Sequence, residues 1–314
     1  MESVWGALIG DACGATLEGI CTEITSEQIE YALTMPGGGM LHVGPGQITD
    51  DGELTLALYR IMKDRPESCR EFPIASVAHA YATWYDSCPF DIGRTCSLAF
   101  ELFSERCPLD EALDEIRSIS ATSEANGALM RITPIASWWA MHPLQTIEET
   151  AQQASVDAEA DASLSHPGIV TCQANAIYVY VLTLLLCGIS PADAIQRVDV
   201  YSTCDTITAW IEESKKDWDE LPDARIAIGH VRYGFIMSLW FIRHPEIGYK
   251  EALYKVLAKG GDTDTNATIV GGIVASYQPI PVYMKERIIS FDATQYGRWP
   301  TRPAEYVPKY ILYA

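Results

Sequence analysis

Two acidic motifs are the residues of this sequence whose types and spacing could carry out chemistry. The first is Thr49-Asp50-Asp51, which follows a glycine-rich loop, and the second is Gly260-Gly261-Asp262-Thr263-Asp264-Thr265. Both motifs offer carboxylate and hydroxyl oxygens without Cys or His, a ligand set that suits Mg²⁺ or Mn²⁺ rather than Zn²⁺. If the two motifs converge in space, their four carboxylates suit a two-metal centre.

Each motif also has a simpler structural interpretation. A single Ser, Thr or Asp at the start of a helix accepts hydrogen bonds from the free N–H groups of the first turn, so either motif alone could be a helix cap. Adjacent carboxylates such as those of Asp50 and Asp51 repel each other unless a cation or hydrogen-bond donors offset their charge. The occurrence of both motifs in one chain therefore favours metal binding.

The elements that must position these motifs are predicted to be helices almost throughout. Apolar residues in the first dozen positions, including Trp5, Leu8 and Ala12, repeat at three- and four-residue intervals, and strand-like alternation is nearly absent. Helix starts with a cap or proline precede acidic first turns at Pro108 and Ser190. The further predicted helical windows are residues 54–61, 74–85, 95–103, 112–119, 132–141, 147–154, 171–186, 205–216, 231–242, 249–257 and 265–277. We expect one all-α domain spanning residues 1–314, because neither a long linker nor an internal repeat divides the chain.

The composition excludes several classes of protein. The 314 residues include 22 basic and 42 acidic side chains, for a formal net charge of −20, and 48% of the residues are hydrophobic. A disordered or collagen-like chain is excluded, and so negative a charge argues against nucleic-acid and membrane partners. Nine cysteines without a CxxC pair, together with an N-terminus that lacks a secretory signal pattern, predict a cytoplasmic protein with free thiols.

One apolar segment resembles a membrane span. No charged residue occurs between His166 and Asp193, and residues 176–187 are almost continuously apolar. A span needs about 20 predominantly apolar residues, whereas Gln173 and Asn175 interrupt this segment. We therefore predict a buried core helix.

The order of the motifs along the chain resembles that of the ADP-ribosylglycohydrolase family, which includes dinitrogenase reductase-activating glycohydrolase and the ADP-ribosyl-acceptor hydrolases. The opening pattern Gly6-Ala7-Leu8-Ile9-Gly10-Asp11-Ala12-Cys13-Gly14, followed by Glu18, and the two acidic motifs carry the resemblance. Between them, Asp91-Ile92-Gly93-Arg94-Thr95, residues 123–131 and Ser165-His166-Pro167 look like the family's substrate-binding segments.

The resemblance implies an all-α orthogonal helical bundle with a binuclear Mg²⁺ or Mn²⁺ centre. Its implied metal ligands are Thr49, Asp50, Asp51, Asp262, Asp264 and Thr265. Asp50 and Asp51 would also be catalytic, and Glu18 would be a general acid or base or would position the acceptor. The implied substrate-binding residues are Asp91, Gly93, Thr95, Ser123, Asn126, Gly127 and His166.

Most of these residues also have an ordinary structural interpretation. Gly93 and Thr95 begin a predicted helix, whose N-terminus binds anions or is simply capped. Asn126-Gly127 is typical of a turn, and His166 precedes a proline that favours extended backbone. Glu18 could be a surface acid at the end of the first helix.

Members of this family cleave the glycosidic bond between the distal ribose of ADP-ribose and an acceptor. Such cleavage builds oxocarbenium character that carboxylates stabilise, and paired cations can orient ribose hydroxyls and activate water. The resemblance implies metal-dependent hydrolysis of protein mono-ADP-ribosyl-arginine. The alternatives are serine-linked or small-molecule ADP-ribosyl conjugates, or an inactive ADP-ribose-binding or structural member. The sequence departs from the family at Gly52-Glu53, where a third hydroxyl residue is common, so we expect altered surroundings of the ligands.

Overall fold

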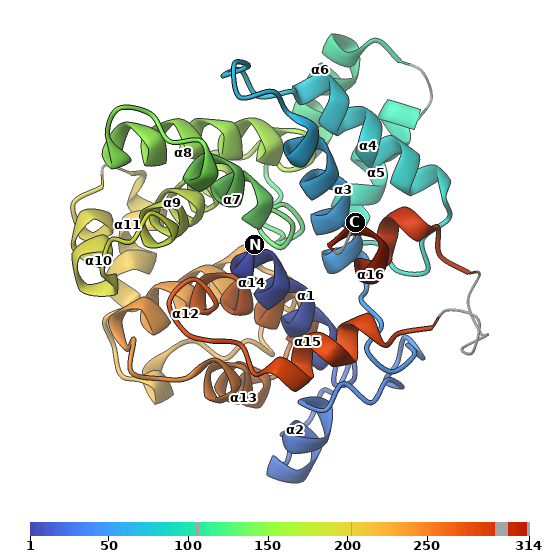
Figure 1. Cartoon of the computed structure of the whole chain (residues 1–314), viewed down its shortest axis with the longest axis vertical. Coiled ribbons are helices and arrows are strands. Elements are labelled where there is room, and N and C mark those ends of the chain that lie inside the picture. The colour runs from blue at the N-terminus through green and yellow to red at the C-terminus, as the bar shows by residue number, and fades with distance from the viewer. Residues whose placement is uncertain (105–106, 202, 293–300, 313–314) are drawn as a thin grey trace.

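The structure is a computed structural model that describes residues 1–104, 107–201, 203–292 and 301–312. These residues form sixteen α-helices, two short 3-10 helices and two isolated β-bridges, without a β-strand, so the all-α prediction is confirmed (Figure 1). The helices are α1 (Glu2–Gly14), α2 (Ser26–Ala32), α3 (Asp50–Asp64), α4 (Ile74–Asp86), α5 (Arg94–Ser104), α6 (Leu109–Ser120), α7 (Thr133–Met141), α8 (Ile147–Ser163), α9 (Ile169–Leu186), α10 (Pro191–Asp199), α11 (Asp205–Glu213), η1 (Trp218–Glu220), α12 (Val231–Arg243), α13 (Tyr249–Lys259), α14 (Thr263–Val274), α15 (Val282–Ile289), η2 (Ala304–Tyr306) and α16 (Pro308–Ile311).

Every predicted helical window coincides with a helix, but several boundaries differ. The helix α8 continues to Ser163, past the acidic residues Asp157 and Asp161 that weaken its apolar pattern. Both acids are buried because they pair with Arg65 and Arg131, respectively. Helices α2, α15 and α16 were not predicted, because each buries only one or two side chains and so shows little periodicity.

The antiparallel pair of α1 and α14 forms the centre of the molecule (Figure 1). Glycines at every fourth position of α1 allow the two backbones to meet. A Cβ atom on Gly6 would lie 2.2 Å from the carbonyl oxygen of Gly271, and one on Gly14 would lie 2.3 Å from the Cα atom of Asp264. This close packing places the end of α1 against the second acidic motif.

Replacing Gly10 by Ala should therefore destabilise the protein. In an open helix the change would favour folding by up to about 1 kcal/mol, but the new Cβ would lie 2.1 Å from the carbonyl oxygen of Ala267. Overpacking of this kind costs about 1 to 3 kcal/mol. Urea denaturation would measure the loss. Gly248→Ala is the control, because its Cβ would meet no atom within 4 Å, and an equal effect in both variants would contradict the close approach of the helices.

The apolar helix α9 is buried, as predicted. Its 18 residues, with a mean hydropathy of 1.8, are long and apolar enough to cross a membrane, but 72% of them are buried inside the protein. It packs against α7, α8, α10, α11 and α12. The helix therefore forms part of the core.

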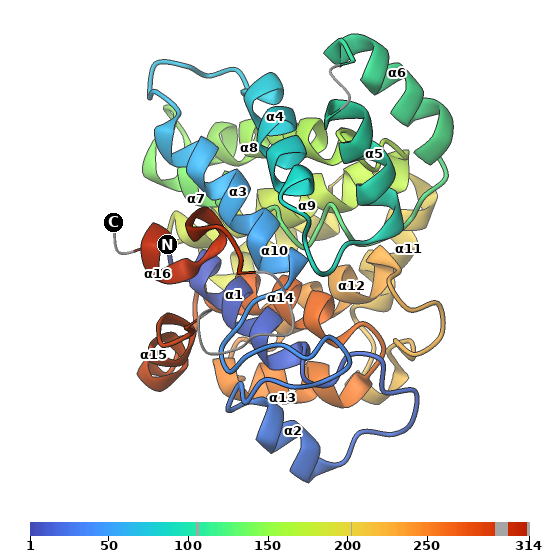
Figure 2. The same cartoon turned by 90° about the vertical axis from the view of Figure 1, so that its right-hand side faces the viewer.

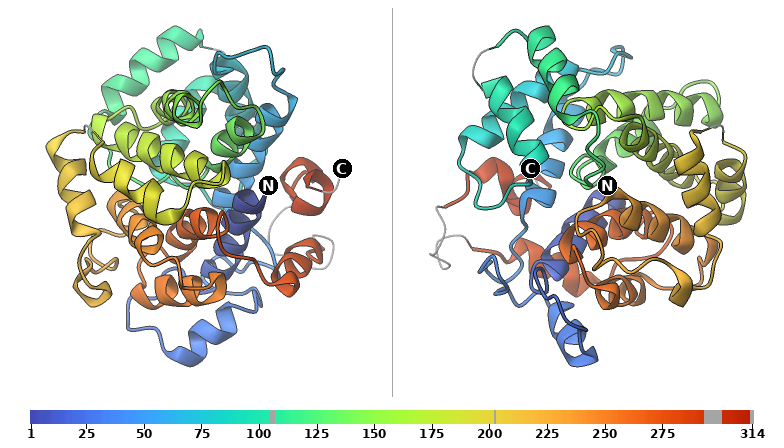
Figure 3. Two further views of the ribbon diagram at one scale, coloured as in Figure 1. Left: turned by 60° about the vertical axis from the view of Figure 1, so that its left-hand side comes forward. Right: turned by 180° about the vertical axis from the view of Figure 1, so that it is seen from behind.

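The remaining helices surround the central pair. Figures 2 and 3 show α3 to α6 on one side of α1 and α14, and α13 with the protruding α2 on the opposite side. The helix α3 contacts both members of the pair. Both acidic motifs thus begin helices that meet at the centre of the molecule.

Candidate active site

Most of the predicted site residues line one cavity of about 250 Å³. Of the fourteen, all except Thr49 and Ser123 lie in its wall. The twelve that do are Glu18, Asp50, Asp51, Asp91, Gly93, Thr95, Asn126, Gly127, His166, Asp262, Asp264 and Thr265. The fold therefore brings together six segments that are distant in the sequence.

The first turn of α3 is held by a residue that the sequence analysis did not single out. The fully buried carboxylate of Asp11, on α1, accepts hydrogen bonds from the backbone N–H of Thr49 at 2.9 Å and of Gly52 at 2.8 Å. It also accepts one from the Thr49 hydroxyl at 2.9 Å. Asp11 thus caps α3 from a neighbouring helix, which explains why the Thr49 side chain does not cap it. An acidic residue among the apolar residues of α1 is the feature of the sequence that could have indicated this role for Asp11.

The carboxylates of the two acidic motifs form a buried cluster. Burial raises the pKa of Asp50, Asp51 and Asp264 well above the usual range of an aspartate, and neighbouring carboxylates raise it further. The Oδ1 atom of Asp51 is buried without a hydrogen-bond partner among the described residues. The Thr265 hydroxyl lies 3.4 Å from Asp51 Oδ2. Concentrated, uncompensated oxygen donors of this kind fit a hard divalent cation.

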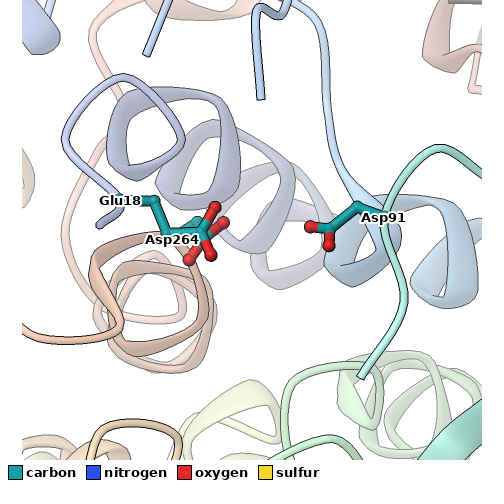
Figure 4. Close-up of side chains that lie close together, drawn as sticks. All are labelled: Glu18, Asp91 and Asp264. Carbon is teal, nitrogen blue, oxygen red and sulfur yellow. The ribbon is translucent and has the colours of Figure 1, made fainter. Parts of the chain in front are cut away.

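Two further carboxylates face this cluster. One carboxylate oxygen each from Glu18, Asp91 and Asp264 lie within 4.8 Å of one another, and Figure 4 shows Asp91 pointing towards the other two. Burial, followed by the charges of Asp91 and Asp262, raises the pKa of Glu18 to about 7. The Oε2 atom of Glu18 is buried without a partner among the described residues. This arrangement makes Glu18 and Asp91 candidate cation ligands, a role that the sequence analysis did not give them.

Asn126 connects the substrate-binding segment to the second acidic motif. Its side-chain Nδ2 donates a hydrogen bond of 2.8 Å to Asp262 Oδ2, and its backbone N–H donates to the carbonyl of Gly229 at 2.9 Å. Ser123, outside the cavity wall, lies with its hydroxyl oxygen 3.0 Å from that of Thr95. Asn126 therefore orients a predicted ligand, and Ser123 supports Thr95 from behind.

The start of α5 and Gly127 shape the opposite wall. A Cβ atom on Gly93 would meet no atom within 4 Å, so the N-terminus of α5 is accessible to a ligand. At Gly127, by contrast, a Cβ would lie 2.8 Å from Cys96 Sγ and 3.2 Å from His166 Cε1. Glycine at position 127 allows the His166 ring to approach the cavity wall.

A buried network fixes the His166 ring. The guanidinium of Arg131 donates to Asp161 at 3.0 Å and to the Ser165 hydroxyl oxygen at 3.0 Å, and that oxygen lies 2.8 Å from His166 Nδ1. Because a guanidinium only donates, the Ser165 hydrogen is free to bond Nδ1, and the imidazole proton is then on Nε2. His166 Nε2 is buried and has no partner among the described residues. His166 thus offers one N–H donor to the cavity.

His166 is expected to stay neutral, with its proton on Nε2, from pH 5 to pH 8. Burial, followed by the charge of Arg131, lowers the pKa of His166 to about 3. In the unfolded chain the same imidazole takes up a proton near pH 6.5, so this residue destabilises the fold as the pH falls from 6.5 towards 3. Nitrogen-15 NMR of labelled histidine would report the tautomer. Ser165→Ala should mix the two tautomers, and a protonated ring at pH 6 in the unmodified protein would contradict the assignment.

Comparison with known proteins identifies the family and the fold. The sequence model of the family described as ADP-ribosylglycohydrolase matches residues 1–288. A protein of Acanthamoeba polyphaga mimivirus, named as an ADP-ribosyl glycohydrolase, is 24% identical over 320 residues, which cover 95% of this chain and 93% of the relative. The ADP-ribosyl-dinitrogen reductase glycohydrolase of Rhodospirillum rubrum is 33% identical over 138 residues, 44% of each chain.

Two other comparisons extend this result. The ADP-ribosylarginine hydrolase Tri1 of Pseudomonas putida is 28% identical over 176 residues, which cover 51% of this chain and 41% of the relative. A solved structure described as an ADP-ribosylglycohydrolase-related protein complex has a TM-score of 0.72 at 19% identity, covering 99% of this chain and 95% of its own, and so shares the fold. The chain belongs to the ADP-ribosylglycohydrolase family and is a hydrolase of ADP-ribosyl conjugates.

Proposed function

We propose that this protein removes ADP-ribose from arginine side chains of modified proteins in a reaction that depends on divalent cations. The observation that carries the proposal is the cavity in which carboxylates of both acidic motifs meet Glu18 and Asp91. The names of two relatives, an ADP-ribosylarginine hydrolase and an ADP-ribosyl-dinitrogen reductase glycohydrolase, support the arginine linkage and a protein substrate.

The buried carboxylates would hold two Mg²⁺ or Mn²⁺ ions. Asp50, Asp51, Asp264 and Thr265 have the required oxygen donors at the cavity wall, and Asp262 is oriented by Asn126. When bound, the cations supply positive charge that orients the hydroxyls of the distal ribose and polarises a water molecule. They also relieve the repulsion among the clustered carboxylates.

Glu18 is the residue that we assign to proton transfer. Hydrolysis breaks the bond between the anomeric carbon and the arginine nitrogen. The leaving guanidine takes the electron pair and, by way of Glu18, the proton that the attacking water releases. A water oxygen forms the new bond to the anomeric carbon and loses a proton to a base. Glu18 lines the cavity, and its Oε2, which has no hydrogen-bond partner in the described part of the chain, can accept that proton. The neighbouring carboxylates stabilise the positive charge that develops on the ribose.

The rest of ADP-ribose would occupy the wall opposite the carboxylates. The accessible N-terminus of α5, at Gly93 and Thr95, supplies N–H and hydroxyl donors that suit a diphosphate. His166, which also lines the cavity, adds a neutral donor. These neutral N–H and hydroxyl donors would bind and orient the substrate without adding a further charge to the site.

The proposal can be tested with ADP-ribosylated peptides of defined linkage. Arginine-linked and serine-linked peptides would be incubated with the protein and Mg²⁺ or Mn²⁺, and the released ADP-ribose measured by chromatography. We expect release from the arginine linkage that stops when a chelator is added and resumes when the cation is restored. Release from the serine linkage alone, or from small-molecule conjugates alone, would contradict the proposed acceptor. Release unaffected by chelation would contradict the cation requirement.

A further inference from the structure

A buried arginine near the C-terminus contacts the helix that begins with the first acidic motif. The side chains of Arg302 and Glu53 are only 3% and 2% exposed. Arg302 Nε donates to Glu53 Oε1 at 2.8 Å, and its Nη2 donates to Oε2 at 2.7 Å, which makes a two-point contact. Arg302 lies outside residues 1–288, which match the family model. The contact is therefore supplied by a part of the chain beyond that match.

The same guanidinium also holds a second segment of the site. Arg302 Nη1 donates to the carbonyl oxygen of Ser87 at 2.8 Å, and Nη2 donates to the Ser87 hydroxyl at 2.8 Å. Ser87 follows the end of α4 and starts the loop that leads to Asp91 and Gly93. Arg302 thus joins the first turns of α3 to the loop that carries Asp91.

These two segments carry carboxylates that interact with each other at the cavity wall. Asp50 is three residues before Glu53, on the first turn of α3, and its carboxyl group interacts with that of Asp91. Trp84 Nε1 donates to Glu53 Oε2 at 2.7 Å, so α4 takes part in the same contact. A shift of α3 relative to the loop would change the spacing between Asp50 and Asp91.

We propose that Arg302 is a positioning residue that sets this spacing, and that residues 301–312 are a required part of the active site. This inference rests on the proposed function in one respect, namely that the carboxylates of Asp50 and Asp91 take part in the hydrolysis. The 3-10 helix η2 and α16, on either side of Val307, both pack against α3 (Figure 2). Tyr306 lies under the guanidinium, with the Arg302 Cζ atom 5.5 Å from the ring centroid.

The geometry requires arginine in particular. The planar guanidinium has five N–H donors, and here they bond to a carboxylate, a carbonyl and a hydroxyl at once. A lysine ammonium would neutralise Glu53 but could not join both segments with the same geometry. Arg302→Lys therefore keeps the positive charge that compensates Glu53 but removes the contact that positions the two segments.

The test compares Arg302→Ala and Arg302→Lys with Lys309→Ala, a control on α16 in the same C-terminal segment. Hydrogen exchange of residues 87–93 in the ligand-free protein should be faster in both Arg302 variants than in the control. Turnover of the ADP-ribosylated arginine peptide should fall about 10- to 100-fold, with a smaller change in KM. Exchange in residues 87–93 that does not change in Arg302→Ala would overturn the proposal, even if the unmodified protein had no hydrolase activity.

A double variant distinguishes positioning from simple charge compensation. Glu53→Gln combined with Arg302→Met removes both buried charges and should restore much of the stability that Arg302→Ala loses. Because neither side chain then joins α3 to the loop, turnover should remain low and exchange of residues 87–93 should remain fast. If turnover and slow exchange of residues 87–93 both returned in the double variant, the proposal would be overturned. That result would show that Arg302 serves only to neutralise Glu53.

Discussion

Replacing Asp264 by Asn is expected to abolish ADP-ribose release and, at the same time, to stabilise the metal-free protein. The Asp264 carboxylate is buried, and burial together with Glu18, Asp262 and Asp51 raises its pKa well above the usual range. Removing one charge from this cluster relieves repulsion, so the thermal midpoint without cations should rise. The same change removes a cation ligand, so kcat/KM should fall by about 10³-fold or more.

Three measurements separate these effects. Calorimetry would measure the unfolding midpoint without cations, titration would measure Mn²⁺ affinity, and the peptide assay would measure turnover. Asp219→Asn is the matched control, because Asp219 is exposed on η1 and lies outside the cavity wall. A loss of turnover in Asp264→Asn accompanied by a lower midpoint would indicate misfolding and contradict the electrostatic explanation.

Replacing Glu18 by Gln should slow the chemical step far more than it weakens ADP-ribose binding. Glutamine keeps the shape of the side chain but cannot accept a proton, and general acid–base residues contribute about 10²- to 10⁴-fold to turnover. Single-turnover kinetics would measure the chemical step, and calorimetry with ADP-ribose would measure binding. Glu23→Gln is the control, because Glu23 is an exposed acid five residues further along the chain.

Two results would contradict the role given to Glu18. If the variant kept its single-turnover rate and lost only affinity for ADP-ribose, Glu18 would bind substrate rather than transfer a proton. If its rate recovered fully at high Mn²⁺ concentration, Glu18 would act as a cation ligand, as its closeness to Asp91 and Asp264 allows.

The two acidic motifs could be recognised from the sequence because each is local. Closely spaced carboxylates after glycines, followed by an apolar helix, mark Thr49-Asp50-Asp51 and residues 260–265 without knowledge of the fold. The resemblance to the family then suggested that the motifs meet, and the cavity contains residues from both. The helices were equally predictable, because a chain with a large core repeats its apolar residues with helical periodicity.

The contacts that support the motifs could not be predicted in the same way. Asp11 reaches Thr49 and Gly52 because α1 packs against α3 and because Gly52 leaves room for its carboxylate. Glu53 and Arg302 are 249 residues apart in the sequence. Contacts between such distant residues depend on how the helices pack against one another. The periodicity of apolar residues predicts individual helices but not their packing.

The departure from the family pattern at Gly52-Glu53 now has a physical explanation. A Cβ atom on Gly52 would lie 2.6 Å from Asp11 Oδ2, so glycine fits the approach of Asp11 to α3. Glu53 does not line the cavity and instead bonds to Arg302 and Trp84. Glu53 thus makes its contacts behind the predicted ligands, and Asp50 and Asp51 line the cavity.

The central claim is that the buried carboxylate cluster holds cations on which hydrolysis depends. The most direct test is turnover of an arginine-linked ADP-ribosylated peptide by protein that has been freed of metal with a chelator and then titrated with Mn²⁺. We predict no release without the cation, recovery on titration in the unmodified protein, and no recovery in Asp264→Asn. Full turnover by the metal-free protein, or recovery in Asp264→Asn equal to that of the unmodified protein, would contradict the claim.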